Sequence, residues 1–116
     1  MKHDLMDRTK EYALQVIELY STLPDDEVAR VLGKQLLRSG TSVGAQYREA
    51  QRAKSPADFV SKIEGALQEL EATRYWLELI DGADLLPLES IRPLQQESTE
   101  LIAILVTIAK NTKSNR

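Results

Sequence analysis

The stretch Ser55-Pro56-Ala57-Asp58 interrupts a helical pattern near the middle of this 116-residue chain. Serine is a preferred N-cap residue, proline suits the first helical position, and the aspartate can reach back toward free backbone N–H groups. The stretch therefore predicts the start of a helix, preceded by a tight reversal of the chain.

Apolar residues recur three and four positions apart on both sides of this reversal, which indicates helices. We predict one helix over residues 25–54 and another over 56–81, which Gly82 ends in the manner of a C-cap glycine. A break near Gly40 is an alternative for the earlier helix, but the unbroken period favours one long helix.

Similar periodicity predicts helices over residues 4–21, with Asp4 as N-cap, and over 88–112. Pro93 is compatible with the last helix only in its first turn, or else it kinks the helix. Four helices joined by short loops predict a single all-α domain over residues 1–116, an antiparallel up-down-up-down four-helix bundle.

Composition excludes several classes of protein. The chain has no cysteine, which excludes disulfides, thiolate metal sites and a cysteine nucleophile. Its longest apolar run, residues 101–109, is too short to span a bilayer, and its start has no apolar stretch of signal-peptide type, so we expect a cytoplasmic protein without membrane association. A net charge of −3 argues against a constitutively basic nucleic-acid binder.

Catalytic patterns are not found in the sequence. The only histidine, His3, lies in the N-terminal segment, and the inward helix positions carry neither recurring acids nor the Glu-x-x-His pairs of di-metal bundles. We therefore predict a protein that is not an enzyme, with no catalytic, cofactor-binding or metal-binding residue.

The charge is distributed unevenly. Residues 28–54 hold six basic residues and one acid, a charge of +5. Because the net charge is −3, the rest of the chain carries −8. At 100° per residue, five of these basic residues fall within an arc of about 80° and form one stripe. They are Arg30, Lys34, Arg38, Arg48 and Arg52.

Three interpretations fit this basic stripe: a solvated surface, pairing with an acidic helix of another copy, or phosphate binding to RNA or DNA. The helix predicted over residues 56–81 would be a suitable acidic partner, since residues 57–81 contain six acids and two bases. No aromatic residue interleaves with the stripe, so base stacking is not indicated.

Small residues form an edge of the same helix. Gly33, Gly40 and Gly44 follow one another along it and would let another helix approach closely, either within the chain or from a partner subunit. Trp76, beside Tyr75, either packs at the edge of the core or anchors an interface, because tryptophan and tyrosine are enriched at interface hot spots.

Two blocks of sequence resemble a known family. They are residues 33–50, GKQLLRSGTSVGAQYREA, and residues 55–63, SPADFVSKI, continued by ALQELE at 66–71 and YWL at 75–77. Together they resemble the four-helix-bundle family named for proteins encoded in intervening sequences of bacterial 23S ribosomal RNA genes.

The resemblance covers nearly the whole chain and implies a ring-shaped homopentamer of four-helix bundles. The family is also similar to the accessory protein of diversity-generating retroelements, a basic pentamer that binds nucleic acid and a reverse transcriptase; this chain differs in being acidic overall. Arg38, Arg48 and Glu49 match the first block, as does Tyr47, and would be contacts for a subunit or a ligand. We expect a homo-oligomeric scaffold or accessory protein, with weak RNA or DNA binding as the alternative and no cofactor.

Overall fold

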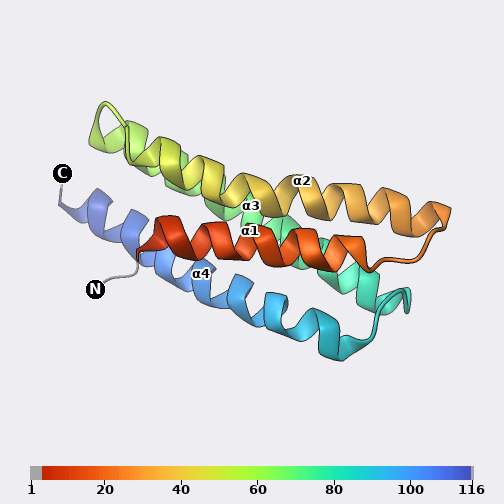
Figure 1. Ribbon diagram of the computed structural model, residues 1–116. Helices are drawn as coiled ribbons and strands as arrows, with labels where there is room; N and C mark the ends of the chain where they lie inside the picture. Colours follow the sequence, from red (N-terminus) through yellow and green to blue (C-terminus); the bar gives the residue numbers. More distant parts are fainter. Residues whose placement is uncertain (1–3, 116) are drawn as a thin grey trace.

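The computed structural model describes residues 4–115 and shows four antiparallel helices in an elongated bundle of 48 × 25 × 20 Å (Figure 1). They are α1 (Leu5–Ser21), α2 (Glu27–Ala50), α3 (Pro56–Gly82) and α4 (Leu88–Ser114). Each helix packs beside its neighbours in chain order, and α1 also meets α4, so that α1 and α3 lie diagonally across the bundle. The predicted all-α four-helix bundle is confirmed; the residue His3 lies outside the described range.

The start of α3 has the predicted cap. The hydroxyl of Ser55 accepts the backbone N–H of Asp58 at 3.0 Å, and the carboxylate of Asp58 accepts the backbone N–H of Lys54 at 3.0 Å. Asp4 caps α1 in the same manner, through the N–H of Asp7. These contacts satisfy N–H groups that the first turn of a helix leaves free.

The helix α2 continues without a break through its glycines, as the period predicted, but its ends differ from residues 25–54. Asp26 is extended and its carboxylate accepts the N–H of Ala29 at 2.9 Å, so the helix begins at Glu27. At the other end the N–H of Ala53 donates to the carbonyl of Ala50 at 3.1 Å. This tighter turn ends the helix at Ala50 and leaves room for the reversal.

The predicted role of Gly82 is wrong. Gly82 is the last helical residue of α3, and Asp84 instead adopts the left-handed conformation, with φ of 57°. The N–H of Leu85 donates to the carbonyl of Ile80 at 3.1 Å, and that of Asp84 to Asp81 at 3.0 Å. This is the Schellman pattern, with Asp84 in the place where glycine is most common.

The helix α4 is two residues longer than predicted, and Lys113 in its last turn forms an ion pair with Glu64 of α3 at 2.8 Å. Pro93 lies in the second turn rather than the first. A proline there cannot donate the helical hydrogen bond to the carbonyl of Glu89. Within residues 4–115, no helix combines the length and the apolar character needed to cross a membrane.

Among the glycines of the bundle, Gly40 makes the tightest contact, and it joins α2 to α1. A Cβ atom added to Gly40 would lie 2.7 Å from Cγ2 and 2.8 Å from Cγ1 of Val16, which is fully buried. Real Cβ atoms do not approach other carbons so closely, and the β-branched Val16 has little rotamer freedom in a helix. The glycine therefore sets the distance between the two helices.

A polar layer crosses the apolar core with one residue from each helix. The hydroxyl of Tyr12 on α1 shares a hydrogen bond of 2.5 Å with Ser98 on α4, and Ser39 on α2 shares one of 2.8 Å with Thr73 on α3. All four residues are buried. Burial raises the pKa of Tyr12 to about 12, although the hydroxyls of Ser98 and Thr73 act in the opposite direction.

The glycine contact makes a prediction for stability. We expect Gly40→Ala to lower the free energy of unfolding by about 1–2 kcal/mol, because the added methyl group overpacks against Val16. Gly82→Ala is the matched control, since a Cβ at Gly82 meets nothing within 4 Å. The control should gain up to about 1 kcal/mol from helix propensity. Urea denaturation measures both, and equal gains in the two variants would contradict the close contact.

The buried tyrosine makes a prediction for pH dependence. Because its pKa rises from 10.0 to about 12 on folding, Tyr12 leaves stability unchanged below pH 10 and lowers it between pH 10 and 12. Urea denaturation should show that wild type loses about 1.4 kcal/mol more than Tyr12→Phe between pH 9 and pH 11. Lysines and the other tyrosines titrate in both proteins, so parallel losses would show that Tyr12 ionises normally.

Candidate interaction surfaces

The five residues of the basic stripe are all exposed. Arg30 forms ion pairs with Asp25 at 2.7 Å and Glu27 at 3.3 Å, and Arg52 lies in the turn beyond the end of α2. Lys34, Arg38, Arg48 and Arg52 form no ion pair with any residue from 4 to 115. The outer side of α2 therefore carries positive charge that the described part of the chain does not neutralise.

An acidic row follows the outer side of α1. Asp7, Glu11 and Glu18 are exposed, and none forms an ion pair within the described chain. Spacings of four and seven residues keep the three carboxylates within an arc of about 40°. These three unpaired acids lie on α1 and the unpaired cations Lys34, Arg38 and Arg48 on α2, each accessible to solvent, although α1 also carries the exposed and unpaired Lys10.

A shallow hollow of about 350 Å³ lies between α1 and α2, with Lys10 and Arg48 among its lining residues. Thr41 also lines it, and its hydroxyl donates to the backbone carbonyl of Leu37 at 2.8 Å. Two cations beside one hollow can attract an anion such as a phosphate group. Of the predicted stripe, only Arg48 contributes to this hollow.

The structure places the glycine edge of α2 against α1 of the same chain. A Cβ at Gly33 would lie 2.8 Å from Leu23 and 3.1 Å from Tyr20, and a Cβ at Gly44 would lie 3.1 Å from the hydroxyl of Thr9. At all three glycines, Gly40 included, side chains of the same chain fill the space beside α2. The small edge therefore packs within the chain rather than against a partner subunit.

A fourth close approach, at Gly65 of α3, was not predicted. A Cβ there would lie 2.9 Å from the side-chain oxygen of Gln46 on α2. The signal available in the sequence was a lone glycine in the middle of a helical pattern, which is unfavourable in a helix unless packing requires it.

The remaining predicted residues lie apart from one another. Tyr47 is half-buried against the core, and burial raises its pKa. Glu49 is exposed and its carboxylate accepts a hydrogen bond from Lys62 of α3 at 3.0 Å. This ion pair raises the pKa of Lys62. Glu49 therefore joins α2 to α3 at the surface.

Trp76 is half-buried beside the core, and its ring lies 5.3 Å from that of Tyr75, which is 53% exposed. Its indole N–H is buried without a hydrogen-bond partner among the described residues. Leaving a buried donor without a hydrogen bond typically costs about 1–3 kcal/mol, so the indole N–H of Trp76 destabilises this part of the bundle.

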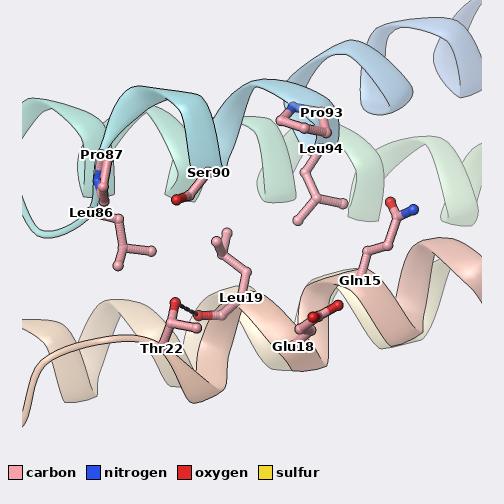
Figure 2. Close-up of a pocket in the computed structure, with 9 residues that line it drawn as sticks. All are labelled: Gln15, Glu18, Leu19, Thr22, Leu86, Pro87, Ser90, Pro93 and Leu94. Atoms are coloured by element: carbon pink, nitrogen blue, oxygen red, sulfur yellow. Dashed lines mark hydrogen bonds between the residues drawn. The ribbon is translucent and has the colours of Figure 1, made fainter.

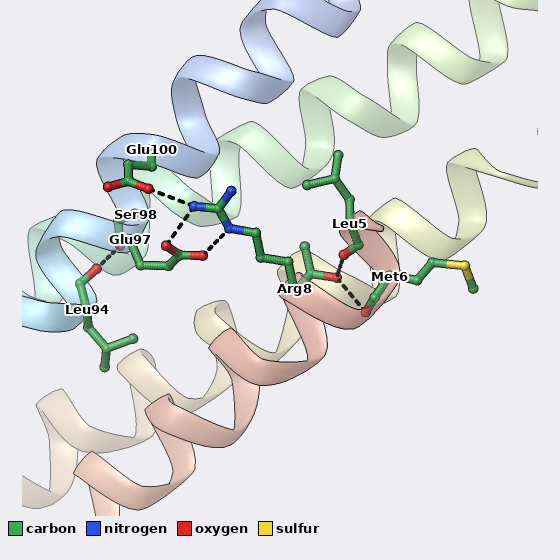
Figure 3. A network of polar contacts seen from close by, with 8 residues as sticks. Leu5, Met6, Arg8, Leu94, Glu97, Ser98 and Glu100 are labelled. Carbon is green, nitrogen blue, oxygen red and sulfur yellow. Dashed lines mark hydrogen bonds and ion pairs between the residues drawn. The ribbon is translucent and has the colours of Figure 1, made fainter. Parts of the chain in front are cut away.

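The seam between α1 and α4 is the most open of the four. Arg8 of α1 crosses it: its guanidinium donates to Glu97 at 2.6 and 2.9 Å and to Glu100 at 2.7 Å (Figure 3). These hydrogen bonds raise the pKa of Arg8, although partial burial acts against them. The bidentate pair with Glu97 is the main polar link between the two helices.

Farther along this seam, toward the α3–α4 loop, a groove of about 540 Å³ opens. Figure 2 shows Leu19 of α1 and Leu94 of α4 pointing into it from opposite sides, with Glu18 at its edge. The hydroxyl of Thr22 donates to the carbonyl of Leu19 at 2.8 Å, so it is held by its own helix. The lining residues are Gln15, Glu18, Leu19, Thr22, Leu86, Pro87, Ser90, Pro93 and Leu94.

The chemistry available to this groove is limited. Glu18 is the one ionisable side chain that lines it, and no second titratable group of the lining could exchange protons with that carboxylate. Across residues 4–115, no three histidine, cysteine, aspartate or glutamate side chains gather in a way that could hold a metal ion. The groove offers an apolar concavity rather than an acid–base pair.

Comparison with known proteins identifies relatives of this arrangement. The family model described as 23S rRNA-intervening sequence protein matches residues 1–107. No curated protein sequence matches the chain. A crystal structure from Bacteroides thetaiotaomicron, described as a protein of unknown function from the S23 ribosomal protein family, is 39% identical, covers 92% of this chain and 99% of its own, and has a TM-score of 0.86.

The family match covers most of the bundle, and the solved neighbour shares its helical fold at substantial identity. Neither description names an enzymatic activity. The chain therefore belongs to the 23S rRNA-intervening sequence protein family.

Proposed function

We propose that this protein is a non-enzymatic, homo-oligomeric four-helix bundle that acts as a scaffold or accessory protein. One observation carries this proposal: the separation of unpaired charge between two outer faces. Lys34, Arg38 and Arg48 on α2 have no acidic partner within the described chain, while Asp7, Glu11 and Glu18 on α1 have no basic one.

Faces of opposite charge on two copies of the chain complement one another. Charge complementarity orients an encounter and selects the register, although exposed pairs add little affinity by themselves. Affinity must come from apolar contact, and large apolar side chains such as Met6, Ile17 and Val31 are exposed on the same helices. A self-assembling bundle uses both features.

The proposed stoichiometry is five copies, as the resemblance to the family implies. A ring requires two different surfaces on each subunit, one of which contacts the other surface of the next copy. The basic face of α2 and the acidic face of α1 supply such a pair of surfaces.

RNA or DNA binding is the second candidate, and one observation favours it. The unpaired cations from Lys34 to Arg48 span about 21 Å of α2, a length over which several backbone phosphates could be contacted. Lys10 and Arg48 beside the hollow between α1 and α2 add a local site for one phosphate. The net charge of −3 opposes this role at long range.

Self-assembly is tested by molar mass. Light scattering after size exclusion at micromolar concentration should give a multiple of 13.1 kDa, about 66 kDa for five copies. Raising the salt concentration should weaken the assembly, because salt screens the charge complementarity between copies. A mass of 13.1 kDa under low-salt conditions would contradict the proposal.

Nucleic-acid binding is tested by charge reversal. We expect micromolar or weaker binding of a short RNA, weakening steeply with salt, and loss of that binding in the double variant Arg38→Glu with Arg48→Glu. Arg92→Glu with Lys110→Glu is the matched control, since both residues are exposed on α4 and the charge change is equal. Equal binding by the two variants in fluorescence anisotropy would exclude the basic stripe as the site.

A further inference from the structure

Two exposed valines lie on the edge of α2 that faces α3. Val28 and Val31 are each 53% exposed. Each lies 18 residues, or five full turns, before a residue that touches α3: Gln46 in the case of Val28, and Glu49 in the case of Val31. Because whole turns return a side chain to the same direction, both valines lie along the α2–α3 seam.

The aromatic pair of α3 lies beside this seam: Trp76 borders α2, and Tyr75 points away from the core on the outer side of α3. Trp76 lies 11 residues after Gly65, within about 20° of the direction in which Gly65 meets α2. Ser39 pairs with Thr73, so Tyr75 lies at the level of residue 37, about 9 Å along the axis from Val31. We name Val28, Val31, Tyr75 and Trp76 the valine–tyrosine face.

A second exposed apolar surface lies on α1. Met6, Leu14 and Ile17 are 37%, 48% and 45% exposed, and Met6 and Ile17 lie within about 20° of one another around the helix. We name these three residues the α1 ridge. Asp7 and Glu18 each come one residue after Met6 and Ile17, so they lie along one side of the ridge. The acidic row therefore borders the ridge.

Charged residues border both surfaces. Arg38 follows Val31 by seven residues on nearly the same line of α2, and Lys34 lies between them on the solvent side. These cations border the valines of the valine–tyrosine face, while Glu71 and Glu78 flank Tyr75 on α3. The acidic row borders the α1 ridge, which also carries Lys10 between Met6 and Leu14. An apolar centre with a charged rim is the usual construction of a specific protein interface.

Resting on the proposed self-assembly, we propose that the α1 ridge of one copy docks on the valine–tyrosine face of the next. The acidic row then lies against Lys34 and Arg38.

The positions of the two surfaces make this contact heterologous. The ridge belongs to α1 and the aromatic pair to α3, and these helices are diagonal in the bundle, with α1 in front and α3 behind in Figure 1. A copy that is bound through one of these surfaces therefore still has the other surface free to bind a third copy. Contacts of this type propagate from copy to copy and close into a ring when the rotation allows.

The experiment disables one surface at a time. The ridge variant is Leu14→Lys with Ile17→Lys, and the face variant is Val31→Glu with Tyr75→Glu; all four residues are exposed, so the fold should persist. Light scattering should give 13.1 kDa for each variant alone, at least a twofold loss of mass. Mixed in equal amounts, the variants should form a one-to-one pair of about 26 kDa and nothing larger, because only the ridge of the face variant and the face of the ridge variant remain intact.

A matched control and two outcomes make the result decisive. Leu88→Glu with Val106→Glu removes exposed apolar residues from α4 and should leave the mass unchanged. An assembled wild type with either surface variant still assembled, or no association on mixing, overturns this docking but leaves self-assembly intact. A monomeric wild type overturns both. Far-UV circular dichroism checks the fold, and Ile17→Lys or Tyr75→Glu alone replaces a double variant that loses helicity.

Discussion

The contact between α1 and α2 at Gly40 is the constraint on which the rest of this bundle depends. With Val16 packed against its backbone at Gly40, α2 lies closer to α1 than a larger residue would allow, and Gly33 and Gly44 repeat the close contact on either side. That contact directs Ser39 inward to the polar layer and the basic stripe outward to solvent. The surface chemistry of α2 is thus a consequence of how its opposite edge packs.

The fixed orientation also decides which surfaces remain for partners. Because the glycine edge is filled by α1, another molecule meets α2 on its opposite, exposed side, where the cations and the valines beside α3 lie. The mild net charge of −3 conceals this arrangement, since the acids that outweigh the cations lie on other helices. What matters for recognition is therefore the direction in which each charge points, not their sum.

Local signals in the sequence were sufficient for much of the fold. The cap at Ser55, the unbroken period of α2 and the exposure of the basic stripe all depend on neighbours within a few residues. Other features depend on distant partners. Arg8 and Glu97 are 89 residues apart. Whether α1 or another copy packs against the glycines of α2 depends on how the helices assemble. At Asp84 a residue other than glycine takes the left-handed position, so the usual signal misled.

Trp76 allows a direct test of the central claim, that copies meet through the valine–tyrosine face, because it is the only tryptophan in the chain. Its fluorescence can be quenched with acrylamide while light scattering follows the mass of the same sample during dilution. The structure predicts that quenching increases as the assembly dissociates, because the partner's ridge leaves the aromatic pair. Dissociation with unchanged quenching would place the contact between copies elsewhere on the bundle.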